Sequence, residues 1–105
     1  MKTRKMKLEQ KVKQLIGETE STHFDVIAHE LWGNNKDGFD CNSSWYLKRD
    51  ADLSEVMEAA RGRWEVFKVN YLPKAKVKDI QDTGWDSTFS LEVDCVPFLE
   101  IRASK

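Results

Sequence analysis

Two histidines and two carboxylates near the start of the chain are the residues with the most evident chemistry. His23, Asp25 and His29 alternate along one predicted extended segment, and Glu30 follows directly. Neutral imidazole and carboxylate are the usual ligands of zinc and of non-haem iron. Along a strand that rises about 3.3 Å per residue, however, the outer two histidines would lie roughly 20 Å apart. The spacing therefore favours a solvated strand face with no metal or other cofactor, and a small metal-dependent enzyme using these groups is the weaker alternative.

The two cysteines are the other nucleophilic candidates. A catalytic thiol needs a nearby base or a helix N-terminus, and neither Cys41 nor Cys95 lies in a recognised signature. The strand register given below places Cys41 on the core face, so we expect both to be small buried hydrophobic residues. The chain also has no Ser-His-Asp signature, no Gly-rich phosphate loop and no CxxC pair. We therefore predict no catalytic residues and favour a protein that is not an enzyme.

Positive charge is concentrated at the N-terminus. Residues 1–16 hold six basic residues and one acid, whereas the remainder holds 11 basic and 17 acidic residues. The six that could contact phosphates are Lys2, Arg4, Lys5, Lys7, Lys11 and Lys13. Lys74, Lys76 and Lys78 could assist them, although the acidic body would repel nucleic acid unless these groups gather on one side. Nucleic-acid binding through a basic N-terminal helix is accordingly our first alternative function.

Aromatic residues favour a different function, the binding of another protein. The chain has four tryptophans among 105 residues, and Trp85 follows a predicted turn without an evident core partner. Exposed tryptophan and tyrosine side chains are typical anchors of protein interfaces. Together with His29, Asn42 and Tyr46 on the polar face of the hairpin, Trp85 forms the predicted binding surface. We therefore predict a small non-enzymatic protein that binds a host protein or a second copy of itself, so a homodimer is possible.

The stretch that must position most of these groups runs from Phe24 to Leu47. It has the pattern of two strands joined by a polar turn at residues 33–38, where Asn, Asp and Gly tolerate positive φ. Pairing Trp32 with Phe39 would place His29 opposite Asn42. The face directed to the core would then consist of Phe24, Val26, Ala28, Trp32, Phe39, Cys41, Trp45 and Leu47. Glu30 interrupts this face, so we expect it at the rim or at a bulge.

Two predicted helices flank the hairpin. An apolar stripe formed by Leu8, Val12, Leu15 and Ile16 predicts an amphipathic helix over residues 3–17, with Gly17 as its C-cap. Asp52 and Glu55 form a capping box that begins a second helix, which should end near Asn70. Its sheet-facing residues should be Leu53, Val56, Met57, Ala60, Trp64 and Phe67. We expect Gly62 to permit a close approach to the sheet, and Arg61 to pair with Glu58 and Glu65 on the solvated side.

Three short strands should complete the chain. They are expected over residues 75–81, with Lys74, Lys76 and Lys78 protecting a sheet edge, over residues 87–93, and over residues 98–102, with Pro97 at an edge or in a turn. The order α-β-β-α-β-β-β predicts an α+β fold in which the second helix packs on one face of an antiparallel sheet. We expect a basic helix over residues 1–17 and one domain over residues 23–103. Without a membrane span or signal peptide, a cytoplasmic location is expected.

One motif within the hairpin resembles that of a known set of proteins. The segment Trp32 to Asn42 reads W-G-N-x-x-D-G-F-x-x-N, and a predicted helix and a three-strand meander follow it. This pattern is similar to that of small uncharacterised proteins of phages and mobile elements, over roughly residues 24–102. Cys41 stands where those proteins usually have valine. The resemblance implies a bacterial or phage cytoplasm but supplies no activity and no functional residue.

Overall fold

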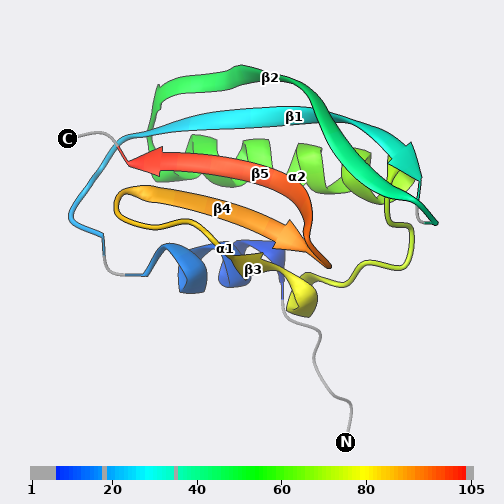
Figure 1. Ribbon diagram of the computed structural model, residues 1–105. Coiled ribbons are helices and arrows are strands. Elements are labelled where there is room, and N and C mark those ends of the chain that lie inside the picture. Colours follow the sequence, from blue (N-terminus) through cyan, green and yellow to red (C-terminus); the bar gives the residue numbers. More distant parts are fainter. Residues whose placement is uncertain (1–6, 18, 35, 104–105) are drawn as a thin grey trace, which may run out of the picture.

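The computed structural model describes residues 7–17, 19–34 and 36–103, which form a five-stranded antiparallel sheet and two α-helices (Figure 1). The elements are α1 (Leu8–Ile16), β1 (Phe24–Asn34), β2 (Gly38–Ala51), α2 (Leu53–Asn70), the 3-10 turn η1 (Val77–Asp79), β3 (Gln81–Asp82), β4 (Thr88–Val93) and β5 (Val96–Ala103). The strand order is β2-β1-β5-β4-β3. The predicted α+β fold and element order are therefore confirmed.

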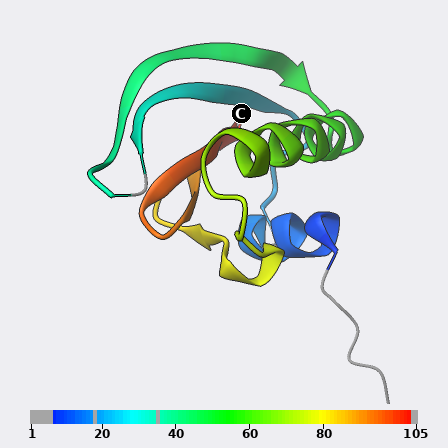
Figure 2. The same ribbon diagram turned by 90° about the vertical axis from the view of Figure 1, so that its right-hand side faces the viewer.

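The β1–β2 hairpin has the predicted location but not the predicted register. Gly33, not Trp32, lies opposite Phe39, and His29 lies opposite Ser44 instead of Asn42. Three register shifts accumulate along the pair, so the 14 residues of β2 accompany the 11 of β1. Extra residues of this kind bend a strand and increase its twist. Figure 2 shows the result, since both strands arc over α2.

The alternation of buried residues reverses at one of these shifts. Val26 and Ala28 face the core, but beyond the shift between Glu30 and Leu31 it is Leu31 that is buried. The expectation that Glu30 marks a bulge is confirmed. The predicted core face is wrong for Trp32 and Cys41 beyond this point, and also for Trp45 opposite Ala28, because all three are exposed. The Leu31 amide donates to the hydroxyl oxygen of Tyr71, the C-cap residue of α2, at 3.2 Å, which ties β1 to the end of the helix beyond the shift.

Helix α2 covers the inner face of the sheet. Its capping box is present, since Asp52 accepts the Glu55 amide at 2.9 Å and Glu55 accepts the Asp52 amide at 3.2 Å. Trp64 and Phe67 pack against Phe98 of β5, with ring centroids 5.2 and 5.6 Å away. The other buried residues of α2 are Val56, Met57, Ala59 and Ala60, whereas Leu53 is more exposed than predicted. The predicted helix and most of its buried face are confirmed.

Two details of α2 differ from expectation. A Cβ atom added at Gly62 would meet nothing within 4 Å, so Gly62 faces solvent instead of approaching the sheet. Arg61 forms an ion pair with Glu9 of α1 and not with Glu58 or Glu65. The pair joins two exposed side chains, so its contribution to stability is small.

Helix α1 shares the core of the rest of the protein. Val12 and Ile16 are buried in the same hydrophobic cluster as the sheet, and α1 lies against α2 and η1. Gly17 caps the helix as predicted, with φ of 70° and its amide donating to the Lys13 carbonyl. Positive φ is a conformation that glycine adopts at little cost. None of the helices in the part of the chain that the structure describes is long and apolar enough to span a membrane.

The C-terminal strands follow the prediction except at residues 75–81. This segment forms the turn η1, and only Gln81 of it belongs to a strand, so the alternating lysines do not protect a long edge. In β4, Leu91 and Val93 are buried as expected. Pro97 lies within β5, in the part that pairs with β4 alone, beside a register shift. That position leaves its missing amide outside a continuous ladder.

The exposed glycine of α2 gives a stability test. Gly62→Ala should stabilise the protein by about 0.5–1 kcal/mol, because alanine loses less conformational freedom than glycine in a helix and has open space here. The change would be measured as the free energy of unfolding in urea.

Gly33 supplies the matched control for this substitution. Its φ is 127°, and an added Cβ would lie 2.0 Å from the Gly38 carbonyl oxygen across the hairpin. Gly33→Ala should therefore destabilise the protein by more than about 1 kcal/mol. Equal effects of the two substitutions would show that the hairpin does not have the register described above.

Candidate functional site

A polar cluster lies where β1 and β2 pair, on the side chains of His29, Ser44 and Cys41. The Nδ1 atom of His29 lies 2.7 Å from the Ser44 hydroxyl oxygen. The Cys41 sulfur lies 3.4 Å from that oxygen and 3.9 Å from Nδ1. In a regular strand, residues three apart point to opposite faces. The extra residue in β2, Asn42, removes this constraint and brings Cys41 to the side of Ser44.

The other ring nitrogen of His29 faces β5. Its Nε2 atom lies 4.0 Å from a carboxylate oxygen of Glu100, and Arg102 donates to the second oxygen of the same carboxylate. From α2, Arg63 donates to the His29 backbone carbonyl at 3.3 Å. Groups from two strands, β2 and β5, therefore contact the imidazole, and Arg63 of α2 holds the backbone of the same residue. Since a carboxylate favours an N–H directed at it, the neutral ring should carry its proton on Nε2 and leave Nδ1 as the acceptor.

The surroundings of His29 keep its ring neutral. Burial lowers the pKa of His29 below its usual value near 6.5, the nearby Glu100 carboxylate acts against this, and Arg63 and Arg102 add to the lowering. At neutral pH the imidazole is therefore an uncharged base, which is the form that accepts a proton. A serine, a thiol and a neutral imidazole in contact can exchange protons.

The histidines and carboxylates that the sequence suggested as metal ligands are not gathered into one site. His23 contacts the Thr22 hydroxyl at 2.9 Å, and Asp25 accepts the Asp50 amide at 3.0 Å. Among the described residues, no group of three or more His, Cys, Asp or Glu side chains could hold a metal ion. The partners of His29 are instead the Cys41 thiol, the Ser44 hydroxyl and the Glu100 carboxylate.

Strand β2 forms one edge of the sheet and is exposed along nearly all its length. From Gly38 to Asp50 each residue is at least partly accessible, and only Ala51 is buried. Trp45 and Tyr46 are 40% and 43% exposed. An arginine covers each ring, with the Arg63 guanidinium carbon 5.5 Å from the Trp45 centroid and that of Arg49 3.8 Å from the Tyr46 centroid.

The four residues predicted as a binding surface divide into two locations. His29, Asn42 and Tyr46 lie on the β1–β2 hairpin, and Tyr46 pairs with Ile27 two residues from His29. Trp85 is 80% exposed but lies in the loop between β3 and β4, near the opposite edge of the sheet from β2. The sequence predicted Cys41 in the core and did not single out Ser44, Glu100 or Arg63. The signal of the bulge beside Cys41 was the charged Glu30 within an apolar pattern.

The predicted phosphate-binding lysines are partly described. Lys2, Arg4 and Lys5 lie outside the described residues. Lys7 and Lys13 are exposed and Lys11 is half-buried on α1. Helix α1 lies against η1 (Figure 1), the segment that holds the exposed Lys78 and that Lys76 directly precedes.

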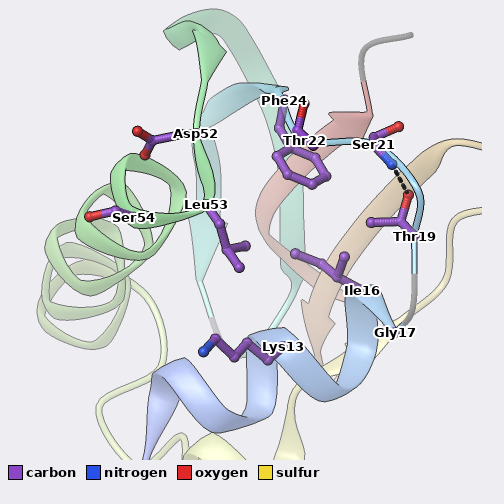
Figure 3. Close-up of a pocket in the computed structure, with 10 residues that line it drawn as sticks. All are labelled: Lys13, Ile16, Gly17, Thr19, Ser21, Thr22, Phe24, Asp52, Leu53 and Ser54. Carbon is purple, nitrogen blue, oxygen red and sulfur yellow. Dashed lines mark hydrogen bonds between the residues drawn. The ribbon is translucent and has the colours of Figure 1, made fainter.

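A cavity of about 570 Å³ separates the end of α1 from the start of α2. Figure 3 shows Ile16, Phe24 and Leu53 as its apolar wall and Lys13 at one side. The helix α2 begins here, but the Asp52 carboxylate already accepts the Glu55 amide and repels an anion. The other residues that line the cavity are apolar or carry hydroxyl groups, so we assign no function to this cavity.

Comparisons with protein-family models, curated proteins and solved structures gave no match to this chain. We therefore infer the function from the geometry of β2 and of the cluster formed by His29, Ser44 and Cys41, the His29 cluster.

The charges around His29 predict opposite effects of two substitutions. Glu100→Gln should lower the pKa of His29 further, because the carboxylate is the group that favours the imidazolium. Arg102→Gln should raise it, because a repelling positive charge disappears and Glu100 loses its hydrogen-bond donor. Both values would be read from an NMR titration of the imidazole nitrogens. Shifts in the same direction for both variants would contradict the arrangement described here.

Proposed function

We propose that the protein binds an extended segment of a partner protein, which adds as a further strand along β2. The observation that carries this proposal is the accessible edge of β2, a 14-residue strand that pairs with β1 on one side only. Such an edge presents a row of backbone donors and acceptors for another chain. Main-chain hydrogen bonds then supply affinity, and side chains on both faces supply specificity.

The side chains along this edge support recognition by direct contact. Trp45 and Tyr46 are neighbours, so they project to opposite faces of the strand, and each stacks with an arginine. Tryptophan, tyrosine and arginine are the residues most enriched among those that dominate interface energies. The pairing of each ring with a guanidinium also orders these long side chains before a partner arrives, which reduces the entropy lost on binding.

The register shifts of β2 limit what can bind. Unbroken pairing with β1 covers residues 38–41 and residues 43–46, with the extra residue Asn42 between them. Bulges and a lysine, here Lys48, are devices that keep a sheet edge from indiscriminate aggregation. We therefore expect short segments of about four residues beside Ser43–Tyr46, not long sheets.

Peptide selection tests the proposed edge. A displayed library of extended peptides would be selected against the intact protein, and affinities of the enriched peptides would be measured by calorimetry. Tyr46→Ala should weaken them by about tenfold or more, equivalent to about 1.4 kcal/mol, because the central anchor is lost.

Trp85 provides the matched control, since it is an exposed tryptophan away from β2. Trp85→Ala should leave peptide affinity unchanged. Peptides that lose affinity with Trp85→Ala and keep it with Tyr46→Ala would place binding on the β3–β4 loop and overturn the proposal. Sedimentation of the free protein as a dimer that Tyr46→Ala dissociates would identify the partner segment as β2 of a second copy.

Nucleic-acid binding is a second candidate, which the packing of α1 against η1 favours. This contact gathers lysines of two segments, and the Glu9 carboxylate among them is neutralised by Arg61. If the lysines of α1 and of the η1 segment bind phosphates, the affinity of the protein for a labelled DNA duplex should fall steeply between about 50 and 200 mM salt. Lys13→Gln should reduce the salt dependence by about one phosphate contact, whereas Lys48→Gln on β2 should not. Absence of binding at the lower salt concentration would dismiss this candidate.

A further inference from the structure

We propose that Cys41 is a site of covalent modification by small disulfides, with His29 as its general base. The thiol does not stand alone: its sulfur lies 3.4 Å from the Ser44 hydroxyl and 3.9 Å from Nδ1 of His29. A nucleophile, a base and a group that orients the base define the usual arrangement of an activated thiol. Here Glu100 at 4.0 Å from Nε2 is the orienting group.

The proton has two short routes from the thiol. It passes directly from sulfur to Nδ1, or through the Ser44 hydroxyl, which lies 2.7 Å from Nδ1 and can accept from one side while donating on the other. Burial keeps the pKa of His29 below its usual value, with Arg63 and Arg102 acting in the same direction and Glu100 against them. The imidazole is therefore free to accept a proton at neutral pH.

The exchange step balances without any further reactant. Cys41 gives its proton to Nδ1, and the thiolate attacks one sulfur of the small disulfide, whose S–S bond breaks. The departing thiolate takes the proton back from His29. One thiol and one disulfide are consumed, and one mixed disulfide and one small thiol are formed. Cys41 is exposed at the edge of the sheet, so an incoming disulfide can reach it.

Cys95 gives the experiment an internal control. It is also a free and exposed thiol, but it lies in the turn between β4 and β5, outside the cluster of His29, Ser44 and Cys41. The Cys41 sulfur also lies 3.6 Å from the Ser43 carbonyl oxygen of its own strand. A difference in reactivity between the two cysteines therefore reports on the His29 cluster.

The test uses the intact protein and hydroxyethyl disulfide, a neutral probe that surface charges do not steer. Mass mapping of quenched samples gives the rate at each cysteine. Cys41 should react about tenfold or more faster than Cys95. His29→Gln should reduce the Cys41 rate to that of Cys95, and Ser44→Ala should reduce it partly. The wild-type Cys41 rate should rise with pH as His29 loses its proton and then level off.

Circular dichroism and the unchanged Cys95 rate would show that each variant is folded. If His29→Gln disturbs the hairpin, Glu100→Gln supplies a second route, since it leaves Cys41, Ser44 and His29 in place and should shift the pH profile of the Cys41 rate to lower pH. Equal rates at Cys41 and Cys95, or a Cys41 rate whose pH profile is unaffected by Glu100→Gln, would overturn the proposal.

Discussion

The feature on which the rest of the structure depends is the bending of the β1–β2 hairpin over α2. Helix α2 presents Trp64 and Phe67 to the sheet, where both rings pack against Phe98 of β5. The hairpin closes over the helix because β2 has three more residues than β1, inserted at register shifts. Each inserted residue lengthens the edge strand and increases the twist of the pair. The hairpin must therefore bend in order to bury its core face against α2, and the extra residues that allow the bend lie in β2, the edge strand.

Arg63 of α2 contacts both the bent hairpin and the residue at the centre of the polar cluster, His29. Its guanidinium donates to the His29 carbonyl on β1 and lies over the Trp45 ring on β2, so a single side chain of α2 bridges both strands of the hairpin. Its Nε atom is buried and has no partner among the described residues. Leaving such a donor unsatisfied costs about 1–3 kcal/mol, which the other contacts of the side chain must offset. The cost is consistent with a side chain held by the geometry of the bend.

The sequence predicted the elements because their signals are local. The Asp52 capping box, the glycine after α1 and the Asn-Asp-Gly turn each depend on residues within one helical turn or one loop, and all lie where they were expected. The hairpin register could not be predicted in the same way. Counting residues outward from a turn assumes that side chains alternate between the two faces without interruption. The register shifts in this hairpin instead accompany its bending over α2, a helix that comes later in the chain. The strand predicted over residues 75–81 was wrong for a related reason. Lysines at every second position have the two-residue period of a strand, but the buried residues of the segment, Ala75 and Ile80, are five positions apart and do not follow that period.

The same bend explains why the proposed modification site and the proposed binding edge fall on one strand. In an unbroken strand Cys41 and Ser44, three residues apart, would point to opposite faces, and the bulge at Asn42 brings the thiol to the side of Ser44 and His29. The thiol is at the end of the first of the two stretches of β2 whose pairing is unbroken, residues 38–41 and 43–46, next to the extra residue Asn42. A group attached to Cys41 would therefore lie beside residues 43–46, where the proposed partner segment is expected to bind. A modified thiol and a bound segment would compete for this part of the edge, so the oxidation state of one cysteine would set how much of β2 is open to a partner.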